Sequence, residues 1–148
     1  MRQIELRGAD ATRSLGRALA GAVQGGLCIL LEGELGAGKT TLCQGFIEAR
    51  TGIPYAPSPT FTLLQSYPGG LYHLDLYRLA QADLREFDLE EILAPESVLL
   101  VEWPGRARGW PEDRLEIALA GDGELRTAIF APFGAAAQAA LERLRWPA

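Results

Sequence analysis

Continuous and alternating runs of hydrophobic residues predict two kinds of strand in this chain. Residues 27–32 (LCILLE) and 97–103 (SVLLVEW) are short, nearly uninterrupted hydrophobic runs, which are typical of parallel strands buried on both faces. Residues 2–7 (RQIELR) alternate between polar and hydrophobic positions, which predicts an edge strand. We therefore expect a sheet that contains two buried parallel strands.

Two further pairs of alternating segments surround glycine-rich turns. The segment 56–79 contains Pro-Gly-Gly at 68–70, and the alternation on both sides of this turn predicts a hairpin. Residues 114–120 (RLEIALA) and 125–131 (LRTAIFA) flank a Gly-Asp-Gly turn and predict a second hairpin. With two antiparallel hairpins the sheet is expected to be mixed.

Helices are predicted between these strands. Asp10 is in position to cap a helix that continues to about Val23, with its apolar residues on one face. Helices are also predicted for 39–50, 81–94 and 134–146. Each expected strand is therefore connected to the next by a helix or a tight turn.

A glycine-rich run follows the first buried strand. Gly33-x-x-x-x-Gly38-Lys39-Thr40 matches the complete phosphate-binding loop (P-loop) pattern, in the expected place between a strand and a helix. The glycines let consecutive backbone N–H groups face a nucleotide's phosphates, and the helix adds its positive N-terminus. Lys39 is predicted to reach the β- and γ-phosphates, and the Thr40 hydroxyl to bind Mg²⁺. Lys39 is the only lysine among 14 basic residues, as expected where a compact ammonium is needed rather than a broad guanidinium.

This order of elements predicts an α/β fold resembling P-loop NTPases. We expect a three-layer sandwich, with helices on both faces of a mixed, mostly parallel sheet that includes the two antiparallel hairpins. A length of 148 residues suits one domain, because single cores typically span about 50–200 residues. With no internal repeat or domain boundary in the pattern, residues 1–148 are predicted to form a single P-loop ATPase domain.

Composition restricts the functional classes. The chain has 19 acidic and 14 basic side chains and a formal net charge of −5, so it is expected to bind nucleic acid poorly by itself. Residues 83–96 carry much of this charge as an acidic face, which is either solvated or docks a basic partner. Without a membrane-spanning run or a signal peptide, and with only Cys28 and Cys43, we expect a cytoplasmic protein with no membrane association.

Two acidic residues are candidates for chemistry. Glu102 ends the second buried strand, where a P-loop protein usually places a carboxylate that binds Mg²⁺. Many such proteins have Asp there, so Glu is a departure that allows contact with the metal directly or through water. On residues 71–78, a period of two places His73, Asp75 and Tyr77 on one face. Asp75 is predicted to orient or deprotonate a water, or to hold Mg²⁺ through water; His73, the only histidine, is expected to be structural.

Two loops complete the candidate site. Residues 58–62 (SPTFT) form either a switch-like loop that senses the γ-phosphate or a turn stiffened by proline. Trp103 directly follows Glu102, and Arg106 and Arg108 come next. An arginine here could contact phosphate or a partner, although surface arginines are the default.

Four segments together resemble one family. GELGAGKTT, SPTFTL, YHLDLYRL and LLVEWP occur in the order and spacing of the TsaE (YjeE) family. The resemblance extends from the helix start at Ala11 and Thr12 to about Pro132. Phe61 replaces a frequent Tyr, which leaves the resemblance intact.

The resemblance implies an activity, cofactors and partners. Members of this family are bacterial ATPases required for threonylcarbamoyladenosine synthesis on tRNA, and they bind ATP and Mg²⁺. Alone they hydrolyse ATP weakly; partner proteins are expected to stimulate them. The implied partners are TsaD-like and TsaB-like proteins, whose complex would be reset by ATP hydrolysis, and tRNA would be contacted only through these partners.

The resemblance also implies site residues. Lys39, Asp75 and Glu102 would be catalytic, and Thr40, Glu102 and Asp75 would hold the metal. The implied nucleotide-binding residues are Thr12, Gly33, Glu34, Leu35, Gly36, Ala37, Gly38, Lys39, Thr40, Thr41, Ser58, Thr60 and Trp103.

Two other functions share the same loop. A small-molecule kinase would need an acceptor pocket and a lid rich in arginine, but between Thr41 and Glu102 the chain has only Arg50, Arg78 and Arg85. A nucleotide-dependent adaptor that does not hydrolyse ATP is the third possibility.

Overall fold

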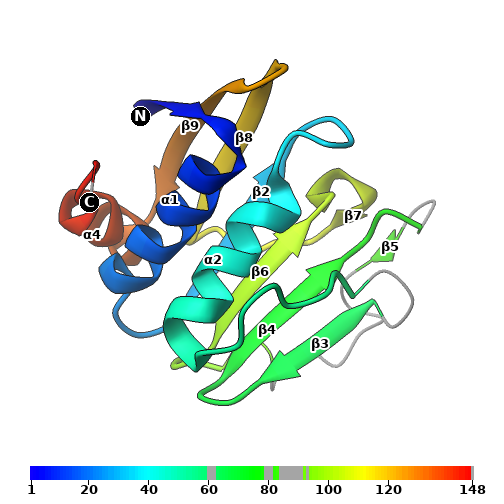
Figure 1. Cartoon of the computed structure of the whole chain (residues 1–148). Helices are drawn as coiled ribbons and strands as arrows, with labels where there is room; N and C mark the ends of the chain where they lie inside the picture. The colour runs from blue at the N-terminus through cyan, green and yellow to red at the C-terminus, as the bar shows by residue number, and fades with distance from the viewer. Residues whose placement is uncertain (60–62, 79–81, 84–91, 93, 148) are drawn as a thin grey trace.

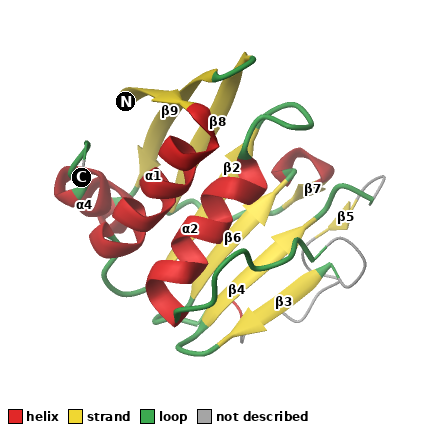
Figure 2. Cartoon of the chain, in the orientation of Figure 1, coloured by secondary structure: helices red, strands yellow, loops and turns green. Residues whose placement is uncertain are grey.

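The computed structural model describes residues 1–59, 63–78, 82–83, 92 and 94–147 of the chain. Its elements are β1 (Arg2–Arg7), α1 (Gly8–Ala22), β2 (Leu27–Glu32), α2 (Lys39–Thr51), β3 (Leu64–Tyr67), β4 (Leu71–Asp75), β5 (Ala82–Asp83), β6 (Val98–Glu102), the 3₁₀ helix η2 (Pro104–Arg106), β7 (Ala107–Arg108), β8 (Arg114–Asp122), β9 (Leu125–Phe133) and α4 (Ala135–Arg143). Figures 1 and 2 show how the helices and strands are arranged.

A seven-stranded sheet organises the described residues, in the order β1-β9-β8-β2-β6-β4-β3. The four adjacent strands β8, β2, β6 and β4 are parallel to one another, and β8–β9 and β3–β4 are the two antiparallel hairpins. Strand β1 pairs antiparallel with β9 and so runs in the same direction as the parallel strands. The expected α/β fold with a mixed, mostly parallel sheet and two hairpins is confirmed.

Both buried strands occupy the predicted central positions. Strand β2 pairs with β6 on one side and β8 on the other, with Leu31 opposite Glu102 and opposite Ile117. All of its residues from Leu27 to Leu31 are buried. The carboxyl ends of β2, β6 and β4 therefore meet at one edge of the sheet, where ligands bind in open α/β folds.

The described α-helices all cover one face of the sheet (Figure 1). The main core contains Leu15 and Leu19 of α1, Phe46 of α2 and Ala137 of α4, packed on sheet residues such as Ile29. The opposite face has a second, smaller core. It consists of Cys28, Leu30, Leu74, Leu76, Ile92, Leu99 and Val101, with Trp103, Ala107 and Trp110 packed against it. We expected helices on both faces; on this second face Ile92 is helical and buried, and most of the predicted helix 81–94 around it lies outside the described residues.

Helices α1 and α2 touch through backbone. An ideal Cβ at Gly45 would lie 2.0 Å from the carbonyl oxygen of Arg13, and one at Gly16 would lie 2.1 Å from that of Leu42. Each glycine therefore allows a close approach that no larger residue permits. This contact fixes α2, whose first turn carries Lys39, against the rest of the domain.

The start of α1 and the end of α4 differ from the prediction. Helix α1 begins at Gly8, with the extended residue Arg7 at its N-cap, so Asp10 lies in the first turn and is not the cap. The early start has a physical reason: the Gly8 N–H donates a 2.8 Å hydrogen bond to the Glu124 carbonyl, which fixes the chain where β1 passes directly into α1. Helix α4 ends at Arg143, three residues earlier than expected.

The predicted acidic helix is wrong at its beginning. Ala82 and Asp83 form β5, which pairs in parallel with β7. Their backbone groups are therefore used in this two-stranded ribbon and not in a helix. Residues 81, 84–91 and 93 lie outside the described part of the chain. In the described part, no helix is both long and apolar enough to span a membrane.

Candidate nucleotide site

The loop between β2 and α2 is shaped by two glycines. Gly38 is the N-cap of α2 and has φ 111°, a conformation that favours glycine. A Cβ at Gly33 would lie 2.6 Å from the carbonyl oxygen of Leu119 in β8, so only glycine allows the loop to start this close to the sheet. The loop therefore delivers the helix N-terminus to the edge where the parallel strands end, which is a suitable place for an anion.

Lys39 lies at the mouth of this loop. Its side chain is 4% exposed, and its ammonium donates hydrogen bonds to the carbonyl oxygens of Gly33 and, at 2.9 Å, Glu34. Burial lowers the pKa of Lys39 below its ordinary value, while the negative charges of Glu102 and Asp75 act in the opposite direction. The ammonium is thus a partly desolvated positive charge held where the loop can present it to an anion.

Glu102 connects three elements at the end of β6. The Thr40 hydroxyl donates to its Oε1 at 2.8 Å, and Nε2 of His73 lies 2.7 Å from its Oε2. Glu102 is 2% exposed and His73 is 1% exposed. A buried carboxylate needs such hydrogen bonds, because burial without them is costly.

Asp75 ends strand β4 beside Glu102, its register partner in β6. Its Oδ2 accepts a 2.8 Å hydrogen bond from the Ser58 hydroxyl, and its Oδ1 accepts one from the Tyr77 backbone N–H at 3.0 Å. Two hydrogen bonds from different segments hold the carboxylate in one orientation. A carboxylate in this place is suited to orient a water molecule.

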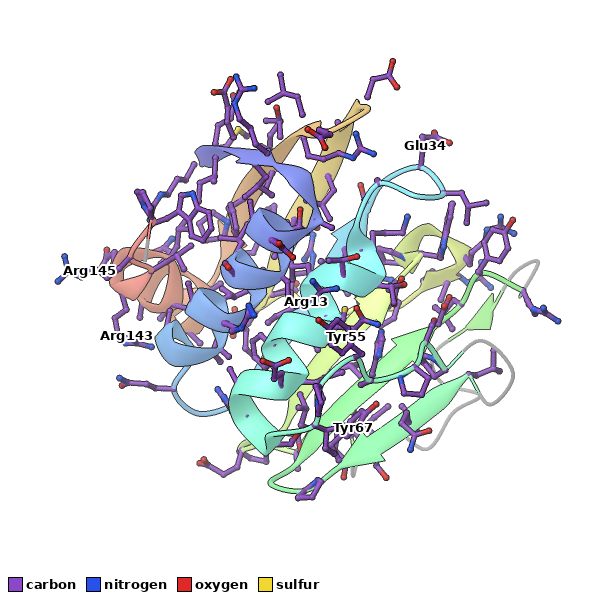
Figure 3. The ribbon with its side chains drawn as sticks, viewed as in Figure 1. Arg13, Glu34, Tyr55, Tyr67, Arg143 and Arg145 are labelled. Atoms are coloured by element: carbon purple, nitrogen blue, oxygen red, sulfur yellow. The ribbon has the colours of Figure 1, made fainter. Side chains whose placement is uncertain are left out.

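The segment that carries Ser58 is held by α1 and α2. Gln44 of α2 donates from Nε2 to the Ala56 carbonyl at 3.1 Å. Arg13 of α1 lies against the ring of Tyr55, with its guanidinium carbon 4.7 Å from the ring centroid (Figure 3). These contacts anchor the segment just before Ser58, so its hydroxyl can reach Asp75.

Trp103 closes the site from the side of β6. Its backbone is left-handed, with φ 60°, and its ring lies 4.9 Å from that of Tyr77, centroid to centroid. The Lys39 ammonium lies 4.2 Å from the Trp103 centroid and the Arg106 guanidinium carbon 5.6 Å from it. Cations at such distances are attracted to the ring, so Trp103 links the loop lysine to the following 3₁₀ helix.

A cavity of about 350 Å³ lies between these groups. It is lined by Leu35, Gly36, Gly38, Lys39, Thr40, Thr41, Ser58, Asp75, Tyr77, Glu102 and Trp103. A neighbouring cavity of about 210 Å³ is lined by Thr12, Ala37 and Thr41 among others, next to the N-terminal end of α1. The loop thus separates a polar chamber with the carboxylates from a smaller chamber beside Thr12.

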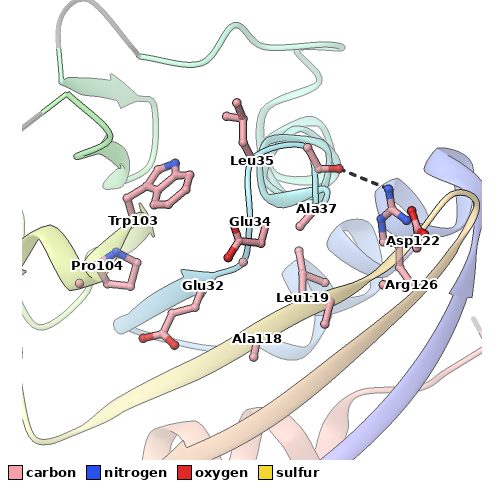
Figure 4. A pocket seen from close by; sticks show the side chains of 15 residues that line it. Glu32, Glu34, Leu35, Ala37, Trp103, Pro104, Ala118, Leu119, Asp122 and Arg126 are labelled. Atoms are coloured by element: carbon pink, nitrogen blue, oxygen red, sulfur yellow. Dashed lines mark hydrogen bonds between the residues drawn. The ribbon is translucent and has the colours of Figure 1, made fainter.

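A larger hollow, about 760 Å³, lies on the other side of the loop. Gly33 and Glu34 contribute to it, together with Trp103, Ala118 and Leu119 (Figure 4). Glu34 is exposed and its side chain projects from the loop tip (Figure 3). Its carbonyl, not its carboxylate, contacts Lys39.

The structure brings most of the predicted site residues together. All lie on the loop or line one of these three hollows except Thr60, which is outside the described residues. Thr12 is placed beside the loop, because a Cβ at Gly38 would lie 3.3 Å from its Cγ2.

Tyr77 and Arg126 are two of the lining residues that the predicted set does not contain. Tyr77 lines the main cavity. The period-two pattern of residues 71–78 places it on the same face as His73 and Asp75, so the sequence could have indicated it. Arg126 of β9 lines both side hollows and bonds the Gly36 carbonyl at 3.4 Å (Figure 4). No sequence pattern connects Arg126 with the loop, since the contact depends on the β8–β9 turn.

The donor set at the end of β6 fits Mg²⁺. The Thr40 hydroxyl and the Glu102 carboxylate are hard oxygen donors already in contact, and Asp75 adds a further carboxylate. Cys43 also has its ligand atom within 4.8 Å of those of His73 and Glu102. Burial raises the pKa of the Cys43 thiol well above its ordinary value, so the sulfur stays protonated and is no ligand for a hard cation.

Comparisons with known proteins agree on one family. The family model described as "Threonylcarbamoyl adenosine biosynthesis protein TsaE" matches residues 6–128. A tRNA threonylcarbamoyladenosine biosynthesis protein TsaE from a Nostoc species is 38% identical over 143 residues, which cover 90% of this chain and 87% of the relative. The protein of that name from Bacillus subtilis is 36% identical over 132 residues, covering 84% and 83%. The crystal structure of Bacillus subtilis YdiB has a TM-score of 0.73 and 32% identity, covering 97% of this chain and 94% of that one.

Proposed function

The chain belongs to the TsaE family, and we propose that it is a magnesium-dependent ATPase that serves tRNA threonylcarbamoyladenosine biosynthesis. One observation carries the ATPase part of this proposal. The complete phosphate-binding loop ends at Thr40, and the Thr40 hydroxyl contacts the Glu102 carboxylate of the adjacent parallel strand at 2.8 Å. A phosphate cradle and hard oxygen donors therefore lie side by side, which is the combination that a nucleotide with Mg²⁺ requires.

Each part of the loop has a role in this proposal. The loop backbone and Lys39 bind the β- and γ-phosphates, and the chamber beside Thr12 accepts the adenosine end of ATP. Thr40 and Glu102 hold Mg²⁺, with Asp75 acting directly or through water. Once bound, Mg²⁺ supplies positive charge that offsets the negative charge of the phosphates.

Asp75 and Ser58 act on the attacking water. Asp75 orients the water and accepts its proton, and the hydrogen bond from Ser58 fixes the carboxylate for this task. Residues 58–62, of which 60–62 lie outside the described residues, are proposed as the switch-like loop that senses the γ-phosphate. Thr60 belongs to this proposed response.

The pathway implies partners. We propose that hydrolysis is weak in the isolated chain, is stimulated by a TsaD-like and a TsaB-like protein, and resets their complex. The tRNA would be contacted by these partners, which suits a chain of net charge −5. The proposed setting is the cytoplasm.

Calorimetry tests the nucleotide site. We expect ATP with Mg²⁺ to bind the unsubstituted chain and the Arg145→Ala control, which removes an exposed positive charge at the C-terminal end (Figure 3). Lys39→Ala should abolish binding, because the phosphate charge then has no partner in the loop. Normal affinity in Lys39→Ala would refute the assignment of the loop.

A pull-down tests the pathway. We expect a TsaD-like protein to be retained differently with ATP and with ADP. Failure to bind it with either nucleotide would contradict the proposed pathway while leaving the ATPase site intact. Faster phosphoryl transfer to a metabolite than to water would favour a kinase instead.

A further inference from the structure

Two of the neighbours of His73 on its face of the sheet are leucines. His73 lies in β4 on the sheet face covered by α2, two residues after Leu71 and opposite Leu100 of β6. At 1% exposure, an imidazole among leucines has lost its contact with water. Such burial is costly unless the ring is hydrogen-bonded, so the contact that the ring makes indicates why it is there.

That contact is with Glu102. Nε2 of His73 lies 2.7 Å from Oε2 of Glu102, and Nδ1 is buried without a hydrogen-bond partner in the described part of the structure. A carboxylate only accepts hydrogen bonds, so Nε2 carries the proton and donates it. The ring thus directs its Nε2–H at Glu102.

The two oxygens of Glu102 have different partners. Oε1 accepts from Thr40 of α2, and Oε2 accepts from His73 of β4. A glutamate has one more rotatable bond than an aspartate, so its carboxylate needs a second anchor to remain in one orientation. With Oε2 bound to the ring, Oε1 stays directed toward Thr40.

We infer that His73 is a positioning residue that holds the Glu102 carboxylate for Mg²⁺ binding, an inference that rests on the proposed function. His73 does not line the cavity of about 350 Å³, so it acts through Glu102 and does not touch the nucleotide. The longer acid at the end of β6 and the buried histidine of β4 therefore form one unit. Groups that orient a metal ligand in this way commonly change metal affinity by about 10–100-fold when they are removed.

Two substitutions separate orientation from packing. The side-chain amide nitrogen of His73→Gln can reach about where Nε2 lies, whereas that of His73→Asn reaches only about as far as Nδ1. Both are polar amides, so burying either one should cost a similar amount of folding free energy. Gln65→Ala, at the exposed cross-strand neighbour of His73, is the control for the hairpin.

The measurement is ADP affinity by calorimetry, in EDTA and across a Mg²⁺ series, with direct Mn²⁺ binding by electron paramagnetic resonance. In His73→Asn we expect the half-saturating Mg²⁺ concentration to rise about 10–100-fold while ADP affinity in EDTA is unchanged. His73→Gln should recover most of this loss, and Gln65→Ala should match the unsubstituted chain. Thermal unfolding confirms that each variant is folded.

Two results would overturn the inference. One is a normal Mg²⁺ requirement in folded His73→Asn. The other is an equal loss of ADP affinity with and without metal, which indicates damage to the site as a whole. If the unsubstituted chain bound no ADP under any condition, the proposed function would fail first, and this outcome is distinct from both.

Discussion

The Thr40 hydroxyl donates a 2.8 Å hydrogen bond to Oε1 of Glu102, joining two residues that are 62 positions apart in the sequence. The contact results from the topology, because β2 and β6 are adjacent parallel strands and Leu31 lies opposite Glu102. Helix α2 follows β2 after one short loop, so its first turn begins above the end of β6. The proposed metal site is therefore built from the central and most buried part of the sheet.

Removing the charge of Glu102 should impair metal-dependent chemistry more than nucleotide binding. In Glu102→Gln, the side chain keeps its shape but becomes a weaker ligand for a hard cation. We expect Mg²⁺-dependent ATP hydrolysis to fall by at least the roughly 10–100-fold that loss of a group orienting a metal ligand causes, with ADP affinity in EDTA nearly unchanged. Phosphate release and calorimetry measure the two effects, and Glu5→Gln on the edge strand β1 is the control. Equal losses in hydrolysis and metal-free binding would indicate that Glu102 is structural.

Asp75→Asn tests the proposed role of Asp75 toward water. The amide oxygen can still accept from the Tyr77 N–H, but the group can no longer accept a proton from water. We expect slower single-turnover hydrolysis by about 10²–10⁴-fold, with ATP affinity within a few-fold of normal. Unchanged turnover, together with nucleotide-dependent partner binding, would favour the adaptor alternative.

The contact between α1 and α2 predicts opposite effects for two similar substitutions. Gly45→Ala places a Cβ 2.0 Å from the Arg13 carbonyl oxygen, and overpacking of this kind costs about 1–3 kcal/mol of unfolding free energy. Gly21→Ala, also in a helix but with nothing within 4 Å, should stabilise by up to about 1 kcal/mol. Urea denaturation measures both. Equal stability of the two variants would contradict the described packing.

The lowered pKa of Lys39 predicts how nucleotide affinity depends on pH. The protonated form binds phosphate, and phosphate raises the pKa of the bound lysine, so binding above the pKa of the free site requires proton uptake. Affinity should be constant below that pKa and fall above it. Because burial lowers the pKa of the free site from 10.5, the bend in a plot of log affinity against pH should lie below 10.5. Calorimetry from pH 8 upward, where ATP is fully ionised, would contradict this if the bend lay at 10.5 or above.

The loop and the strands around it could be predicted from local sequence. Residues 27–32 and 97–103 are hydrophobic enough to be central strands, and the loop pattern between a strand and a helix has a known geometry. Period-two alternation correctly placed His73 on the face shared with Asp75. These predictions succeeded because each uses a pattern formed by residues that are close together in the sequence.

The remaining features depend on contacts between distant segments. The hydrogen bond between Gly8 and Glu124 moves the start of α1, and pairing with β7 makes Ala82 and Asp83 a strand. The partner of His73 is also non-local, because it depends on the register between β4 and β6. Periodicity assigns a residue to a face, but only the packed sheet shows which side chain it meets.

The most direct test of the central claim uses the single lysine of the chain. An amine-reactive label can modify only Lys39 and the α-amino group, so the α-amino group is an internal reference. With saturating ATP and Mg²⁺, peptide mass spectrometry should show slower labelling of Lys39, in proportion to the fraction of chains bound, and an unchanged rate at the α-amino group. An unchanged rate at Lys39 would contradict the claim that its ammonium binds the phosphates of ATP.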